Sequence, residues 1–141
     1  MDDPDACVFC QIIAGRLPAR TVYEDAGHIA FFPLEHINPG HLVLIPKRHT
    51  DYLFDLDSTA YQALWATAAR IAGPLRDAMS AKRVGVAVEG FSVPHVHVHL
   101  IPINAFDDLD PSRARALDAA EADRLHALIR EALAGAAPQC P

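Results

Sequence analysis

An alternation of histidine with aliphatic residues constrains the fold of this chain more than any other sequence feature. Within residues 92–102, the histidines are His95, His97 and His99, and the aliphatic residues between and after them are Val96, Val98 and Leu100. Successive side chains of a β-strand point to opposite faces, so the pattern predicts a strand over 95–101 with imidazoles on one face and an apolar core on the other. Three imidazoles on one face are costly to bury without partners, which indicates a functional site.

Three kinds of chemistry use such a row of histidines. Neutral imidazoles ligate catalytic metals, and three of them with a water form an open zinc site. Alternatively, one imidazole attacks phosphorus while its neighbours donate hydrogen bonds to the phosphoryl oxygens. A row of imidazoles can also bind an anion without reaction. The pattern alone leaves these alternatives open.

The rest of the sequence predicts an α+β fold. Four further strands are expected at 21–24, 28–32, 41–45 and 84–88, and helices at 9–14, 58–79 and 118–133. Because the helices are segregated from the strands, a mainly antiparallel five-stranded sheet is expected, with strand 41–45 in a central position. Pro74 lacks the backbone N–H that a helix interior needs, so the long helix is expected to kink or break near residues 70–73.

Composition restricts the partners of the protein. The 141 residues suit a single domain, and 12 basic against 18 acidic residues give a formal net charge of −6. This balance argues against non-specific electrostatic binding to nucleic acid or anionic lipid. No apolar run reaches the ~20 residues of a membrane helix. We therefore expect a cytoplasmic protein that binds neither nucleic acid nor membrane. Three cysteines are too few for a disulfide scaffold, and Cys140 is regarded as incidental.

Several motifs together resemble one known family. They are the histidine alternation at 95–101, Cys-Val-Phe-Cys and its continuation at 7–20, Tyr-Glu-Asp at 23–25, and the segment Asn-Pro-Gly-His-Leu-Val-Leu-Ile-Pro-Lys-Arg-His at 38–49. The chain thereby resembles the histidine triad superfamily of nucleotide hydrolases and transferases over residues 7–102, with 103–141 as a C-terminal extension. The resemblance implies a five-stranded antiparallel sheet with a long helix, continued across a homodimer, and a small nucleotide substrate.

The same resemblance implies roles for the residues of the histidine segment. His97 would be the nucleophile, attacking the α-phosphorus of a nucleoside phosphoramidate or a mono- or dinucleoside polyphosphate to give a nucleotidyl-histidine that water hydrolyses. His99 would donate a hydrogen bond to a phosphoryl oxygen. Ser92 would bind near the leaving group.

A structural zinc site is also implied. Cys7 and Cys10 have the Cys-x-x-Cys spacing of one side of a tetrahedral zinc site. Bacterial members of the superfamily that have this cysteine pair resemble this chain in using His49 and His95 as the other two ligands. A closed shell of four ligands leaves no position for substrate, so such a zinc would be structural. A reactive dithiol and an unligated pair of buried thiols are the alternatives.

The substrate pocket resembles that of relatives in part. Aromatic and aliphatic residues at matching positions would sandwich a purine: Val8, Phe9, Ile12, Phe31 and Leu34. Pro33 stands where most members have the Asp that holds the ribose hydroxyls, and Phe91 stands where a Gln usually contacts phosphate. The segment 107–110 is acidic and would repel a polyphosphate tail.

Two other functions therefore remain open from the sequence. The missing polar contacts favour a nucleotide-binding or regulatory module with little or no turnover. A metal-dependent hydrolase would instead place His95, His97 and His99 on one catalytic metal, and its activity would vanish when the metal is removed.

Overall fold

A computed structural model describes residues 6–136 of the chain. Cys140 lies outside the described residues. The elements, in chain order, are α1 (Val8–Ile13), β1 (Thr21–Glu24), β2 (His28–Phe31), β3 (Leu42–Pro46), the 3-10 helix η1 (Leu53–Asp55), α2 (Ser58–Ala78), β4 (Arg83–Ala87), β5 (Val98–Ile103), the 3-10 helix η2 (Pro111–Arg113) and α3 (Ala119–Leu133).

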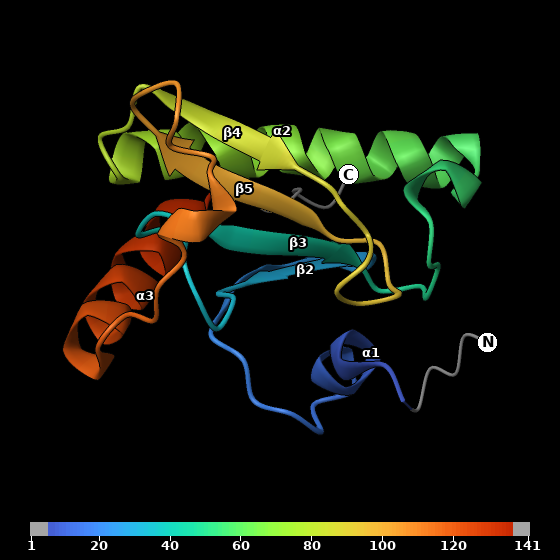
Figure 1. Cartoon of the computed structure of the whole chain (residues 1–141). Helices are drawn as coiled ribbons and strands as arrows, with labels where there is room; N and C mark the ends of the chain where they lie inside the picture. The colour runs from blue at the N-terminus through green and yellow to red at the C-terminus, as the bar shows by residue number, and fades with distance from the viewer. Residues whose placement is uncertain (1–5, 137–141) are drawn as a thin grey trace.

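The strands form one antiparallel sheet in the order β1-β2-β3-β5-β4. β3 lies at its centre, where the apolar run 41–45 predicted it, and all five of its residues are buried. Figure 1 shows the sheet with α2 running along it. The predicted fold class is confirmed, whereas the continuation of the sheet across a dimer stays a prediction.

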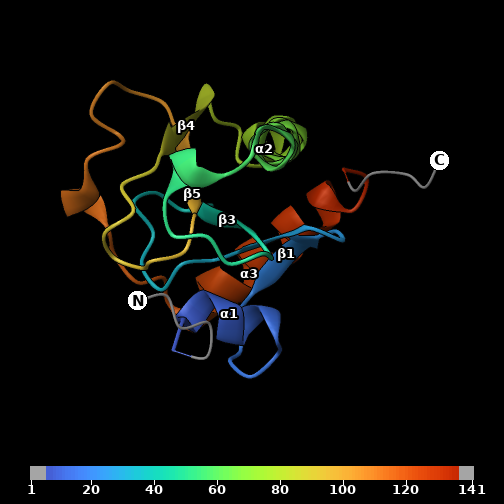
Figure 2. The ribbon, with the colours of Figure 1, turned by 90° about the vertical axis from the view of Figure 1, so that its right-hand side faces the viewer.

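The helices cover both faces of the sheet. α2 and α3 pack on one face, where Leu44, Val98 and Leu100 join their buried residues in the larger core. α1 covers the other face, and Phe9 packs there against Phe31. Figure 2 shows α1 and α2 on opposite sides of the sheet. His99 pairs with Val43 of the second core across β3 and β5, so the histidines belong to the α1 face.

The two long helices, α2 and α3, each begin at an aspartate whose side chain accepts a hydrogen bond from a backbone N–H. Asp57 accepts from Ala60 at the start of α2, and Asp118 accepts from Glu121 at the start of α3.

Within the described residues, no helix is both long and apolar enough to cross a membrane.

One local prediction is wrong, and of the kink or break predicted in the long helix the break is contradicted. The strand predicted over 95–101 begins only at Val98, because the amides of the preceding residues are used elsewhere: that of His95 donates to Val93 and that of Val96 to Thr50. The helix is not broken at Pro74, since α2 continues from Ser58 to Ala78. A missing N–H there removes a single hydrogen bond, which the buried residues of a 21-residue helix offset.

Candidate active site and metal centre

Hydrogen bonds to the backbone fix which nitrogen of His95 bears the proton. Its Nε2 lies 2.8 Å from the carbonyl oxygen of Pro46, at the end of β3. A carbonyl oxygen only accepts, so Nε2 is protonated and the lone pair is on Nδ1. The ring is fully buried, and burial lowers the pKa of His95, which keeps the imidazole neutral.

The Nδ1 atom of His95 faces both cysteines of the Cys-x-x-Cys motif. It lies 3.5 Å from Sγ of Cys7 and 3.6 Å from Sγ of Cys10. Nδ1 of His49 lies 3.2 Å from Nδ1 of His95 and 3.3 Å from Sγ of Cys10. The structure thus brings all four predicted ligands together, with every pair of donor atoms within 4.8 Å.

The spacing of these donors fits a tetrahedral zinc ion. With zinc–ligand bonds of about 2.0–2.3 Å, the edges of the tetrahedron measure about 3.3–3.8 Å, and the four donor–donor distances given above run from 3.2 to 3.6 Å. The bond from His95 Nε2 to Pro46 matches the outer hydrogen bond that orients metal-binding histidines. Two thiols and two imidazoles are also the donor set that Zn²⁺ prefers.

In His97 the proton is on the other ring nitrogen than in His95. Its Nδ1 donates to the carbonyl oxygen of His95 at 2.8 Å, so the lone pair is on Nε2. The side chain is 2% exposed, and Phe9 of α1 packs edge-on against its ring at 5.2 Å. A buried imidazole with a fixed ring and an outward lone pair is suited to act as a nucleophile.

His99 is oriented by a histidine that precedes β3. The amide of Ile37 donates to Nδ1 of His41, so His41 carries its proton on Nε2 and donates it to Nδ1 of His99 at 2.9 Å. His99 must then hold its own proton on Nε2. Burial lowers the pKa of His41 to about 3 and also lowers the pKa of His99, so both rings stay neutral.

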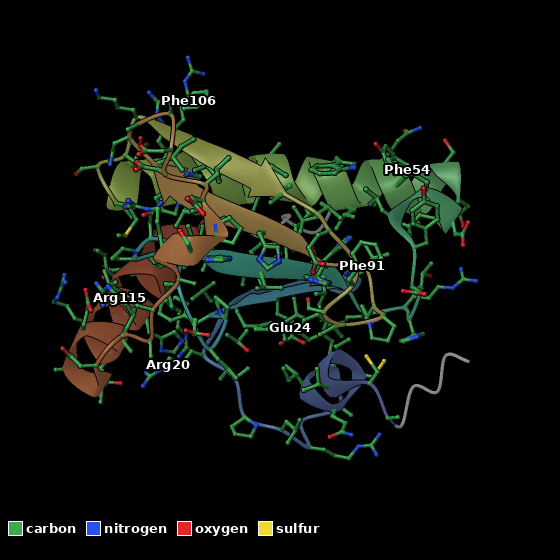
Figure 3. The ribbon with its side chains drawn as sticks, viewed as in Figure 1. Arg20, Glu24, Phe54, Phe91, Phe106 and Arg115 are labelled. Atoms are coloured by element: carbon green, nitrogen blue, oxygen red, sulfur yellow. The ribbon has the colours of Figure 1, made fainter. Side chains whose placement is uncertain are left out.

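The loop between β4 and β5 brings a carboxylate beside the histidines. Oε1 of Glu89 lies 3.7 Å from Nε2 of His97. The same carboxylate accepts the hydroxyl of Ser92 at 2.7 Å and the amide of Phe91 at 2.9 Å. These hydrogen bonds, chiefly the one from Ser92, lower the pKa of Glu89 and keep it anionic. Figure 3 shows Phe91 on this loop, and its side chain is 93% exposed.

A cavity of about 1100 Å³ lies next to His97 and His99. The predicted pocket residues all line it: Val8, Phe9, Ile12, Phe31 and Leu34. Leu34 does so from the rim, because it is 95% exposed. Pro33 and Ser92 also contribute to the wall.

The C-terminal extension completes the cavity. Leu117, Ala119 and Ala122 line it, and the backbone of Arg115 pairs in both directions with that of His36. Figure 3 shows Arg20 near α3, and its guanidinium forms an ion pair with Asp123 at 2.6 Å. The cavity is therefore lined by both the motif-bearing region and the extension.

The sequence matches the model of the HIT domain family over residues 14–106. The chain belongs to the histidine triad (HIT) family. It is 34% identical over 134 residues to an uncharacterized HIT-like protein of Mycobacterium tuberculosis, covering 91% of this chain and 93% of that one.

Two solved HIT structures share the fold over nearly the whole chain. A zinc-bound histidine triad family protein from Mycobacterium smegmatis matches with a TM-score of 0.80 and 29% identity, covering 94% of this chain and 96% of that one. A hypothetical histidine triad nucleotide-binding protein from Sulfolobus tokodaii matches with a TM-score of 0.77 and 25% identity, covering 92% and 93%.

Sequence reasoning assigned no catalytic or binding role to Glu89 or to His41 of this HIT protein. The sequence signal that could have identified Glu89 is its position in the loop directly before the triad. His41 sits in the Pro-Gly-His motif, and only the fold shows that its ring reaches His99. The triad also does not converge on one point, because His95 directs its lone pair to the cysteines.

Proposed function

We propose that this HIT protein is a hydrolase that cleaves a phosphorus–nitrogen or phosphorus–oxygen bond of a nucleoside phosphoramidate or a mono- or dinucleoside polyphosphate. The observation that carries the proposal is the set of fixed tautomers. His97 offers a lone pair on Nε2, and His99 offers a proton on Nε2, side by side with ring centroids 5.1 Å apart. A nucleophile beside a neutral hydrogen-bond donor is the arrangement that phosphoryl transfer needs.

The proposed reaction has two displacements. Nε2 of His97 forms a bond to phosphorus while the bond to the leaving group breaks, and the leaving atom keeps the electron pair and takes a proton from water. Water then attacks the nucleotidyl-histidine, the nitrogen–phosphorus bond breaks, its electron pair returns to Nε2, and the proton of the water goes to solvent. His99 donates to a phosphoryl oxygen in both steps, and Ser92 binds near the leaving group.

We assign zinc a structural role. Cys7, Cys10, His49 and His95 would hold it and tie α1 to the segment that precedes β5. Four protein ligands leave no open position, so none of the reaction passes through the metal. Since thiols stay reduced in the cytoplasm, that compartment suits the two cysteines.

The cavity supports a nucleotide as substrate. The side chains of Phe9 and Phe31 meet edge to face at 5.6 Å, and a flat base would lie against them and the neighbouring Val8 and Ile12. Leu34 would close over the base from the rim. Pro33 offers no side-chain hydrogen bond, so the ribose would be held by contacts other than the usual carboxylate.

A binding module with little turnover is the second candidate. The observation that favours it is Glu89, whose carboxylate occupies the hydrogen-bond donors of Phe91 and Ser92. A catalytic metal held by all three triad histidines is not supported, because the lone pair of His95 and that of His97 point to different sites.

Release of AMP from adenosine 5′-phosphoramidate and from diadenosine polyphosphates tests the proposal. We expect turnover by the wild type and at least a ~1000-fold loss with His97→Ala at unchanged zinc content, because the nucleophile is absent. His126→Gln is the matched control, since His126 bonds to the Thr21 carbonyl and is not one of the residues that line the cavity. Binding of AMP without turnover would favour the binding module, and equal turnover with His97→Ala would exclude His97 as nucleophile.

A further inference from the structure

An anionic side chain lies beside the proposed nucleophile. Oε1 of Glu89 is 3.7 Å from Nε2 of His97, whose side chain is 2% exposed, and the carboxylate itself is about half exposed. A phosphorus atom bound to Nε2 would therefore have this carboxylate as a close neighbour. The charge of Glu89 acts on whatever group is attached to that phosphorus.

The loop holds the carboxylate in place. Oε1 accepts the hydroxyl of Ser92 at 2.7 Å and its amide at 3.3 Å, while Oε2 accepts the amide of Phe91 at 2.9 Å. Three donors of one short loop thus converge on Glu89. Ser92, which we expect near the leaving group, links the carboxylate to the same side of the site.

The cavity has little positive charge to balance this carboxylate. Of the residues found to line it, Arg20 is the one Arg or Lys, and its guanidinium is paired with Asp123 at 2.6 Å. A leaving group with further phosphates would thus meet Glu89 without a free cation at hand. A leaving group that carries an ammonium would form a favourable pair with it.

A metal ion is a less suitable occupant of this place. The donor atoms of Glu89, His97 and His99 lie within 4.8 Å of one another. However, His41 donates to Nδ1 of His99, which leaves the proton on Nε2, where a metal would need a lone pair. The arrangement suits a hydrogen-bonding organic cation better.

We propose that Glu89 determines leaving-group specificity, making the subsite beside His97 favour leaving groups that carry a positive charge and disfavour those that carry further negative charge. This inference rests on the proposed function, because it names the class of substrate that the same site takes. The expected substrates are nucleoside 5′-phosphoramidates whose amine component has a second, protonated amine.

Binding of three adenosine 5′-phosphoramidates tests the proposal. Their amine components are 1,3-diaminopropane, propylamine and β-alanine, so the distal charge is positive, absent or negative while the scissile bond is the same. Dissociation constants are measured by calorimetry with His97→Ala protein, which keeps the ligands intact, with and without Glu89→Gln. The Gln side chain retains the shape and an acceptor oxygen, and Asp55→Asn removes the same charge from η1 as the matched control.

We expect the diaminopropane compound to bind about tenfold more tightly than the β-alanine compound when Glu89 is present. Glu89→Gln should bring the two within about twofold, and Asp55→Asn should leave the ratio unchanged. An unchanged ratio with Glu89→Gln, or no binding of any of the three compounds, would overturn the proposal. The expected ratio without AMP release by the wild type would retain the role of Glu89 and remove the proposed hydrolase.

Discussion

At the scale of single residues, the backbone decides how the triad histidines differ. His95 donates from Nε2 to the Pro46 carbonyl, whereas His97 donates from Nδ1 to the carbonyl of His95. Each ring is left with one lone pair, on Nδ1 in the first and on Nε2 in the second. Two histidines that are two positions apart are thus suited to different tasks, His95 to binding a metal and His97 to attacking a phosphorus atom.

Cys10→Ser should remove zinc from the protein. The substitution replaces a thiolate ligand by a hydroxyl that zinc binds poorly, and the free energy of metal binding is coupled to folding. Elemental analysis should find about one zinc per chain in the wild type and little in the variant, together with a lower Tm. His97→Ala, two positions from a ligand, should keep its zinc. Metal-free wild type prepared under reducing conditions would contradict the assignment.

His36 should make the protein less stable in mild acid. Burial lowers the pKa of His36 to about 4, against the nearby carboxylate of Glu121, which raises the pKa by more than Arg115 lowers it. In the unfolded chain the imidazole takes up a proton near pH 6.5, so below that pH the unfolded state binds more protons and stability falls. As the pH falls from 7 to 5, His36 should therefore lower the free energy of unfolding by about 2 kcal/mol.

Urea denaturation of His36→Phe at both pH values isolates this effect. Phenylalanine suits the site because His36 packs edge-on against Phe32 at 4.9 Å and its Nδ1 is buried without a hydrogen-bond partner. As the pH falls from 7 to 5, the free energy of unfolding should decrease by about 2 kcal/mol less in the variant than in the wild type. A difference that is the same at both pH values would show that His36 does not titrate as its burial requires.

At the scale of elements, α3 is the part of the extension that the core holds. Four of its residues are buried at helical spacing, namely Ala122, Leu125, Ile129 and Leu133. Leu125, Ile129 and Leu133 join the core beneath α2 and β1, while Ala122, in the first turn of the helix, lines the cavity. The position of the cavity wall therefore depends on apolar packing at the far end of the same helix.

Ile129→Ala should lower the free energy of unfolding by about 2–5 kcal/mol, because the side chain is fully buried and its removal leaves a cavity. The neighbouring Leu128 is 41% exposed, so Leu128→Ala serves as the matched control and should cost under about 1 kcal/mol. Urea denaturation measures both. Equal losses in the two variants would mean that α3 does not pack as described.

At the scale of the whole molecule, the two ends of the sheet differ. The strand order puts β1 at one edge and β4 at the other. α3 packs against β1, while β4 has Val86 46% exposed. Unpaired strand edges readily take up another strand, so β4 is the edge where a second copy would continue the sheet.

We expect the protein to be a homodimer of about 31 kDa, twice the 15.3 kDa of one chain. Light scattering after gel filtration measures this mass. Val86→Glu should shift the protein towards the monomer, because a two-fold axis near β4 would bring two equal charges together. Phe54→Glu changes a similarly exposed apolar residue on η1 and should leave the mass unchanged. A wild type that is monomeric at all concentrations would contradict the prediction.

Local sequence patterns were enough to predict most strands, the helices and the residue types that would bind zinc. Period-2 and period-3.6 patterns are local, so α3 and four of the five strands lie within about two residues of their predicted bounds. These patterns did not predict the late start of β5, since that depends on a hydrogen bond from Val96 to Thr50, distant in sequence.

The orientation of the side chains in the candidate site, in contrast, depends on contacts between segments that are distant in sequence. The tautomer of His95 depends on Pro46, 49 positions away, and that of His99 on His41, 58 positions away. The carboxylate of Glu89 reaches His97 because the loop folds around it, and the pairing of Arg115 with His36 holds the extension against the motif-bearing region, where it lines part of the cavity. A local pattern specifies which donors are present, whereas hydrogen bonds between distant segments specify where each donor points.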